Sequence, residues 1–314
     1  MGISVGIAAV GGGILVILLI ASIIGAILAR TARSERGRAT VANLNARVRA
    51  WWLMCIVVFA AVIAGPTTTT ILFALLSFLA LREFITLTPT RRSDHHTLFW
   101  AFFVVVPLQY WFVAMPWFGM LSIFIPVWVF LFVSIRGTLS GDHRDYLERT
   151  AKIQWGLMIC VYCVSHIPAL LSLEIPGYAG RNAELVLFLV AVAQLSDVFQ
   201  YVWGKLLGRR KIAPHLSPNK TWEGFIGGVA TATGVGAALW WMTPFTPTVA
   251  AGMALGITLM GFAGGIVMSA IKRDAGVKDF GATIAGHGGI LDRIDSLCFS
   301  APVLFHLVRF YYTP

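Results

Sequence analysis

Charged residues are scarce in this 314-residue chain, in which Asp, Glu, Lys and Arg make up 12% and hydrophobic residues 58%. Soluble globular domains carry about 25% charged residues, and disordered chains and coiled coils are also rich in charge. The composition therefore excludes these three classes. Together with the mean hydropathy of +0.80, it indicates an integral membrane protein.

Cysteine is also scarce, with four residues that all lie in apolar stretches: Cys55, Cys160, Cys163 and Cys298. Cys160 and Cys163 have the C-x-x-C spacing, but no second pair stands at zinc-ligand spacing. We interpret all four as packing residues in membrane helices and predict no disulfide framework.

The apolar stretches lack the alternating pattern of an outer-membrane barrel and instead predict helices of about 20 residues. We expect an all-α polytopic membrane protein that forms one membrane domain over residues 1–314. Its ten expected spans are 3–29, 51–64, 67–82, 97–114, 116–135, 153–173, 183–204, 223–242, 248–271 and 292–311. Residues 1–50 are interpreted as a retained signal-anchor helix followed by a basic loop, because no basic segment precedes the first span.

Of the 24 Lys and Arg residues, 22 lie in five segments: 30–50, 82–92, 136–152, 205–220 and 272–293. Ten spans place all five segments on one side, which the positive-inside rule makes cytoplasmic. The net charge of +10 is thereby explained by orientation and by anionic lipid headgroups, without a nucleic-acid partner. We expect the inner membrane of a bacterium and a catalytic face toward the cytoplasm.

Asp197 is an acidic residue inside an apolar span, about 12 Å of helix from Lys205. A carboxylate at that depth needs a cation or a wet cavity, although a structural partner would also satisfy it. The following loop contains Lys205, Ser217, Lys220 and Thr221. Ser217 or Thr221 can cap the next helix, and a helix N-terminus with a nearby lysine suits phosphate.

The segment 269–296 carries the strongest signal, because its acids and bases alternate around glycines. Its basic residues are Lys272, Arg273, Lys278 and Arg293, its acidic residues include Asp279, Asp292 and Asp295, and its glycines include Gly288 and Gly289. Asp292 and Asp295 are three residues apart and share a helix face, which suits a hard divalent ion. Acids for Mg²⁺ interleaved with bases for phosphates are what phosphoryl or nucleotidyl transfer requires. His287 could act as a base, bind phosphate or simply occupy a turn.

Ser269 to Asp295 resembles the signature of the phosphatidate cytidylyltransferase (CDP-diacylglycerol synthase) family, and the chain looks like a divergent member. The segment Ser217–Gly224, and Asp197 with Tyr201, Gly204 and Lys205, are similar to two further family motifs. Residues 190–296 therefore form the expected catalytic region. Residues 43–51 and Arg82-Glu83-Phe84 match more loosely, and Gln200 stands where the family usually has a small residue.

The resemblance implies transfer of the cytidylyl group of CTP to phosphatidate, giving CDP-diacylglycerol and pyrophosphate, with Mg²⁺. We expect Asp292 and Asp295 to hold the metal, with Asp279 and Asp197 as further ligands or as acceptors for metal-bound water. Lys272, Arg273 and Lys278 are expected to neutralise phosphates. The expected substrate-binding residues are Lys205, Ser217, Lys220, Thr221, Gly288, Gly289 and Arg293. A homodimer is one assembly that the sequence leaves open.

Three alternatives stay open on the sequence alone. A CTP-dependent kinase or nucleotidyltransferase acting on another lipid, such as a polyprenol, would use similar charges. A secondary transporter would also explain Asp197 and the glycine-rich break before residue 292. A membrane subunit with a decayed site is a third alternative, which the intact acids and bases disfavour.

Overall fold

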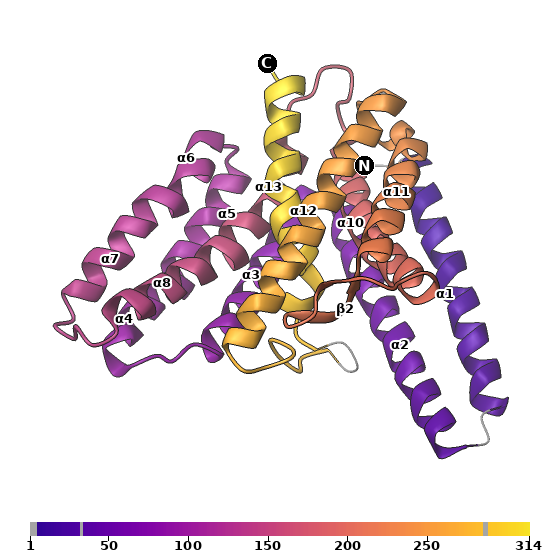
Figure 1. Cartoon of the computed structure of the whole chain (residues 1–314). Helices are drawn as coiled ribbons and strands as arrows, with labels where there is room; N and C mark the ends of the chain where they lie inside the picture. Colours follow the sequence, from indigo (N-terminus) through magenta and orange to yellow (C-terminus); the bar gives the residue numbers. More distant parts are fainter. Residues whose placement is uncertain (1–4, 32–33, 285–287) are drawn as a thin grey trace.

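The computed structural model describes residues 5–31, 34–284 and 288–314 and is almost entirely helical (Figure 1). The helices are α1 (Val5–Thr31), α2 (Glu35–Ala64), α3 (Pro66–Thr86), α4 (His95–Trp100), α5 (Val106–Ala114), α6 (Phe118–Ile123), α7 (Phe130–Thr138), α8 (Tyr146–Leu157), α9 (Val164–Ala169), α10 (Asn182–Leu206), α11 (Trp222–Ala238), α12 (Pro247–Asp274) and α13 (Leu291–Tyr312). One hairpin, β1 (Lys211–Ala213) with β2 (Ser217–Thr221), precedes α11. Short helical turns fill several junctions: η1 (Arg92–Asp94), η2 (Ala101–Val105), η3 (Phe124–Val129), η4 (Met158–Cys163), η5 (Leu170–Ser172) and η6 (Trp240–Met242).

Within the described ranges, eight helical stretches are long and apolar enough to cross a membrane. This confirms the expected all-α membrane architecture. The shorter α11 and the more polar α13 coincide with the two remaining expected spans. The count of ten crossings therefore stays a prediction.

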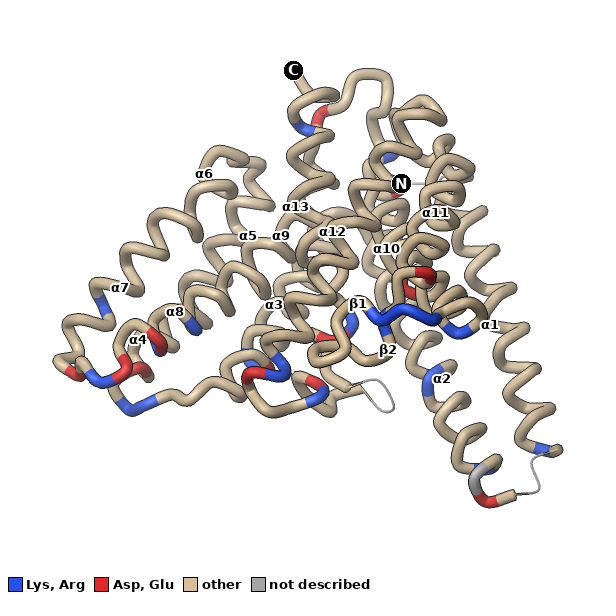
Figure 2. The backbone as a smooth tube through the Cα atoms, in the orientation of Figure 1, with Lys and Arg blue, Asp and Glu red and all other residues tan. Residues whose placement is uncertain are grey.

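The first three helices differ from the expectation in one respect. Residues 35–50 are the first half of α2 and form no basic loop, since Ser34 caps the helix by accepting a hydrogen bond from Gly37 N–H at 3.1 Å. The turn into α3 falls at Gly65, where φ of +115° favours glycine, and Pro66 follows as the first residue of α3. The first half of α2 is therefore a polar helical extension of an apolar span, and it reaches the charged end of the molecule (Figure 2).

Helices α4 to α8 form a separate layer on one flank of the molecule (Figure 1). Arg149 of α8 connects the charged residues at one end of this layer. Its buried guanidinium lies 3.0 Å from Asp94 Oδ1 and 3.3 Å from Asp142 Oδ2. Outside the membrane-spanning segments, the hydrogen bond from Ser93 lowers the pKa of Asp142, and Arg149 and Arg91 add to this. This network joins η1, α8 and the loop between α7 and α8.

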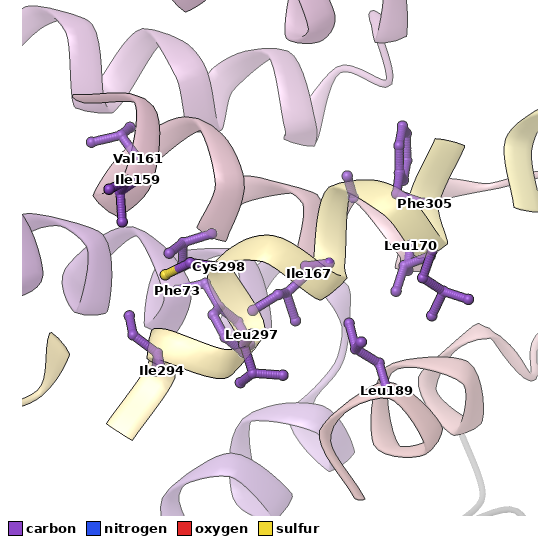
Figure 3. Packing of buried hydrophobic residues seen from close by; sticks show 14 of the residues in the cluster. Phe73, Ile159, Val161, Ile167, Leu170, Leu189, Ile294, Leu297, Cys298 and Phe305 are labelled. Carbon is purple, nitrogen blue, oxygen red and sulfur yellow. The ribbon is translucent and has the colours of Figure 1, made fainter. Parts of the chain in front are cut away.

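The core surrounds α13, which runs through the middle of the bundle. Figure 3 shows Leu297, Cys298 and Phe305 of α13 packed with Ile167 of α9 and Leu189 of α10. All five side chains are buried. Because one face of α13 packs among these apolar neighbours, the core fixes the position of its first turn at the charged end of the bundle (Figure 2).

Helix α11 lies very close to α10. A side chain at Gly228 would overlap Gln200, so only glycine allows the two helices to approach this closely. Gln200 itself donates a hydrogen bond to Ser196 Oγ at 2.8 Å. Its side chain therefore belongs to the interface between α10 and α11.

Most Lys, Arg, Asp and Glu residues gather at one end of the helices (Figure 2). The hairpin β1–β2, the segment after α12 and the first turn of α13 all lie at this charged end (Figures 1 and 2). These parts of the predicted catalytic region thus lie together at the charged end of the helices (Figures 1 and 2).

Candidate functional site

A cavity of about 700 Å³ opens at the charged end between α2, α10, the segment after α12, and α13. Seven of the predicted site residues line it: Asp197, Lys278, Asp279, Gly288, Asp292, Arg293 and Asp295. Asp292 and Asp295 thus both face the cavity, as their spacing predicts. A second cavity, of about 570 Å³, lies between the α2–α3 turn and residues 171–183, and none of the described site residues lines it.

Asp292 is the most completely hydrogen-bonded acid of the site. Its Oδ1 accepts from Lys272 Nζ at 2.8 Å, and its Oδ2 accepts from the backbone N–H groups of Phe280 and Gly289 at 2.8 and 3.0 Å. The side chain is 1% exposed. A carboxylate in the first turn of a helix is also favoured by the helix dipole. Asp292 therefore anchors the glycine-rich segment to α13 and neutralises Lys272.

Glu83 of α3 is a second anchor, which the sequence reasoning noted only as part of a loose motif. Its buried carboxylate accepts from the backbone N–H groups of Ile290 and Leu291 at 3.0 and 2.9 Å, and from Thr283 Oγ1 at 2.6 Å. It thereby satisfies two donors at the start of α13 and fixes the other side of the glycine-rich segment. The signal in the sequence is an acid directly after Arg82 at the end of an apolar span.

The close approach of Glu83 and Asp292 requires glycine at positions 288 and 289. A side chain at Gly289 would overlap the Glu83 carboxylate, and its N–H is already donated to Asp292. Gly288 has φ of +83°, and its carbonyl accepts from Ile284 N–H at 2.8 Å. In this structure Gly289 shapes the segment, while Gly288 remains at the cavity wall. His287 lies outside the described residues.

Lys220 supplies a cation beside the acids Asp197 and Asp295. Its ammonium lies 4.7 Å from the centre of the Phe262 ring, against α12. Burial lowers the pKa of Lys220, and the proximity of Asp197 and Asp295 opposes this shift. Two acids that line the cavity and one lysine beside it, from three different elements, thus interact electrostatically.

The acids of the cavity have the ligand type that a divalent cation prefers, but they supply too few ligands to hold one alone. Asp197, Asp279 and Asp295 are hard oxygen ligands on the same cavity. Among the described residues, however, no three acids, histidines or cysteines lie close enough to bind one ion together. Mg²⁺ is usually held by one or two carboxylates together with substrate phosphates. The residues therefore fit an ion whose coordination the substrate completes.

Seven of the predicted site residues are not among those that line the cavity: Lys205, Ser217, Lys220, Thr221, Lys272, Arg273 and Gly289. Thr221 is the N-cap of α11, accepting from Gly224 N–H at 3.1 Å, which confirms the capping alternative. Ser217 lies in β2, opposite Ala213. Arg273 donates to the Val277 carbonyl at 2.6 Å. Lys205 is exposed at the end of α10, 5.8 Å from the Tyr201 ring centre.

Helix α2 contributes three cavity residues that the sequence reasoning did not assign to the site: Asn43, Arg47 and Trp51. They repeat every four residues and therefore lie on one face of the helix. The sequence reasoning ascribed Arg47 to membrane orientation, because residues 30–50 were expected to form a loop.

Comparison with known proteins identifies a relative that covers most of this chain and others that cover part of it. A protein of Escherichia coli K12 named "Uncharacterized protein YnbB" is 43% identical over 277 residues, covering 85% of this chain and 88% of that protein. The phosphatidate cytidylyltransferase of Staphylococcus aureus strain COL is 41% identical over 131 residues, covering 40% of this chain and half of that enzyme. The corresponding enzyme of Staphylococcus saprophyticus is 41% identical over 133 residues, with the same shares.

The model of the cytidylyltransferase family matches residues 45–311. That range begins within α2 and includes every residue that lines the cavity except Asn43. Since the match extends over most of the chain and the acids and bases of the family signature converge on one cavity, this integral membrane protein belongs to the cytidylyltransferase family.

Proposed function

We propose that the protein transfers the cytidylyl group of CTP to phosphatidate, producing CDP-diacylglycerol and pyrophosphate. The observation that carries the proposal is the cavity at the charged end of the bundle, where acids and bases from α10, the segment after α12, and α13 face one space. The staphylococcal relatives, which match 40% of this chain, are named as phosphatidate cytidylyltransferases, and this supports phosphatidate as the substrate.

The reaction forms a bond between a phosphate oxygen of the lipid and the α-phosphorus of CTP, and it breaks the bond between the α-phosphorus and the bridging oxygen to the β-phosphate. Phosphate monoesters have a second pKa of about 6 and are largely ionised near neutral pH. The attacking oxygen therefore needs no strong general base. What the site must supply is position and positive charge.

Lys278, Arg293 and Lys220 are the cations that we assign to the phosphates of CTP, because they lie at or beside the cavity. Lys272 contributes through Asp292, whose charge it neutralises. We assign the divalent ion, Mg²⁺, to Asp295 and Asp197, with Asp279 as a third acid within the same cavity. When bound, this ion would stabilise charge on the phosphates and orient the leaving group.

The roles of the remaining predicted residues are indirect in this proposal. Thr221 and Ser217 shape the hairpin and the start of α11 that carry Lys220. Asp292 holds the glycine-rich segment in place, and the bonds to its carboxylate leave metal binding to the neighbouring acids. The basic end of the bundle would face the cytoplasm of a bacterial cell, where CTP is found, with the protein in the inner membrane.

The deciding experiment is an assay of purified protein in detergent with phosphatidate, Mg²⁺ and CTP labelled at the α- or the γ-phosphate. Nucleotidyl transfer moves only the α-label to the lipid, whereas a CTP-dependent kinase moves only the γ-label. A chelator is expected to stop the reaction, and added Mg²⁺ to restore it. Transfer of the γ-label, or no transfer to any lipid phosphate, would contradict the proposal.

Asp295→Asn is the matched test of the metal assignment, with Asp274→Asn as a control. Asp274 is an exposed acid at the end of α12, and it does not line the cavity. We expect Asp295→Asn to abolish transfer at every Mg²⁺ concentration and Asp274→Asn to retain it. Equal activity of the two variants would remove Asp295 from the metal site.

A further inference from the structure

We propose that Arg47 of α2 binds the phosphate of the lipid substrate. This inference rests on the proposed function and adds the residue that distinguishes the lipid phosphate from the nucleotide. Arg47 lines the cavity of about 700 Å³ together with Asn43 and Trp51. The three positions lie on one face of α2, and the remaining cations of the cavity lie C-terminal to α11.

The chemistry of Arg47 suits a phosphate. Its side chain is exposed to the cavity, and within the described part of the chain it has no ion-pair partner. Lys272, in contrast, is already paired with Asp292. A guanidinium offers two parallel donors to a phosphate, which gives geometric selectivity as well as charge. Arg47 is therefore a cation that is available for a ligand.

The depth of Arg47 suits a lipid headgroup. The apolar part of α2 begins at Trp51, and Arg47 lies one turn, about 6 Å, toward the charged end. Tryptophans mark the level at which a helix leaves the hydrocarbon and enters the headgroups. The phosphate of a lipid that stays in the bilayer is found at this level, whereas the triphosphate of CTP arrives from water.

The packing of α2 leaves a side approach for the lipid. Helix α2 packs mainly on α1 and α3, and any contact that it makes with α10 or α13 is slight. Beyond Trp51 it presents exposed apolar side chains, including Leu53 and Ile56. These apolar side chains can contact the acyl chains of the lipid while its headgroup lies in the cavity beside Arg47. Helix α2 is in this way the wall of the site that faces the lipid.

Arg49 provides a matched control on the same helix. It is exposed like Arg47, but it lies in a separate groove with Ala29 and Asn45, between α1 and α2. Replacing either arginine with glutamine removes the same charge from the same end of α2. Only the replacement of Arg47 changes the cavity wall.

The test compares Arg47→Gln, Arg47→Lys and Arg49→Gln in mixed micelles, varying phosphatidate and CTP separately. For Arg47→Gln we expect the KM for phosphatidate to rise about tenfold, as loss of one charge-assisted hydrogen bond predicts, and the KM for CTP to change less than about twofold. Arg47→Lys should recover part of the loss, and Arg49→Gln should resemble the wild type. Equal effects of Arg47→Gln and Arg49→Gln, or an equal rise in both KM values, would overturn the inference.

Lipid binding without CTP separates this inference from the proposed function. Native mass spectrometry of the detergent-solubilised protein with phosphatidate should show bound lipid in the wild type and in Arg49→Gln, and less in Arg47→Gln. If the wild type binds phosphatidate in this way but transfers no cytidylyl group, the proposed function fails and Arg47 remains a lipid-binding residue. If all three proteins bind the lipid equally, Arg47 has no such role, whatever the activity.

Discussion

Replacing Asp292 with asparagine separates two roles of this residue, that of a metal ligand and that of a structural anchor. The carboxylate is 1% exposed and accepts hydrogen bonds from Lys272 and two backbone N–H groups. Asparagine keeps the size but removes the charge that Lys272 faces. Removing one partner of a buried ion pair costs about 3–5 kcal/mol.

The assay is thermal unfolding of the detergent-solubilised variants with excess chelator, so that no divalent ion contributes. A loss of 3–5 kcal/mol corresponds to a decrease in Tm of about 5 °C or more for a chain of this size. Lys272→Met and the double variant complete a double-mutant cycle. We expect the double variant to be less destabilised than the sum of the single ones, because each single change leaves the other group without its partner.

The same variants are then assayed for transfer of the α-label of CTP to lipid. Asp292→Asn should lose turnover while it still inserts into membranes, since the glycine-rich segment loses its anchor. An unchanged Tm in chelator, combined with loss of an Mg²⁺-dependent stabilisation, would refute the anchor and return Asp292 to the metal site. Additive effects of Asp292→Asn and Lys272→Met would refute the ion pair.

Three further predictions concern the same end of the bundle. Glu83→Gln should lower Tm and turnover together, because an amide cannot accept hydrogen bonds from Thr283 and two backbone N–H groups as a carboxylate does. The control is Glu174→Gln, at an exposed acid of the other cavity, which should leave both quantities unchanged. Equal Tm values of the two variants would contradict this prediction. Gly289→Ala should abolish turnover, because the added methyl group would overlap Glu83. The control Gly234→Ala, in α11 with open space around it, should have wild-type activity. An active Gly289→Ala variant would show that the glycine-rich segment can shift. Burial lowers the pKa of Lys220 in the folded protein, so the unfolded chain binds more protons at pH values just below the ordinary pKa of 10.5. The contribution of Lys220 to stability should therefore increase as pH rises toward 10.5. Lys220→Met should flatten the dependence of Tm on pH in this window, and an unchanged slope would contradict the assignment.

The helices were predictable from the sequence, because long apolar runs fix membrane helices with little help from context. The extension of α2 to Glu35 was missed, since its arginines were ascribed to a loop although no glycine or proline interrupts residues 38–64. As a consequence, Arg47 and Trp51 were not assigned to the site. A charge that orients a helix and a charge that binds a ligand look the same in a sequence.

The signature predicted which acids and bases gather, but not how they pair. Lys272 and Asp292 are 20 residues apart, and only the path of the glycine-rich segment brings them together. Gln200 follows Asp197 by three residues, yet it faces α11 through contact with Gly228, away from the cavity. Its unusual identity therefore concerns helix packing more directly than substrate choice.

The bond between Glu83 and the first turn of α13 spans more than 200 residues of sequence. During synthesis, α3 enters the bilayer long before α13 leaves the ribosome. The Glu83 carboxylate therefore lacks the backbone N–H donors of Ile290 and Leu291 until α13 is inserted. Completion of the glycine-rich segment is thus among the final events of biogenesis, and the nascent protein acquires a competent site only when its first and last thirds have met.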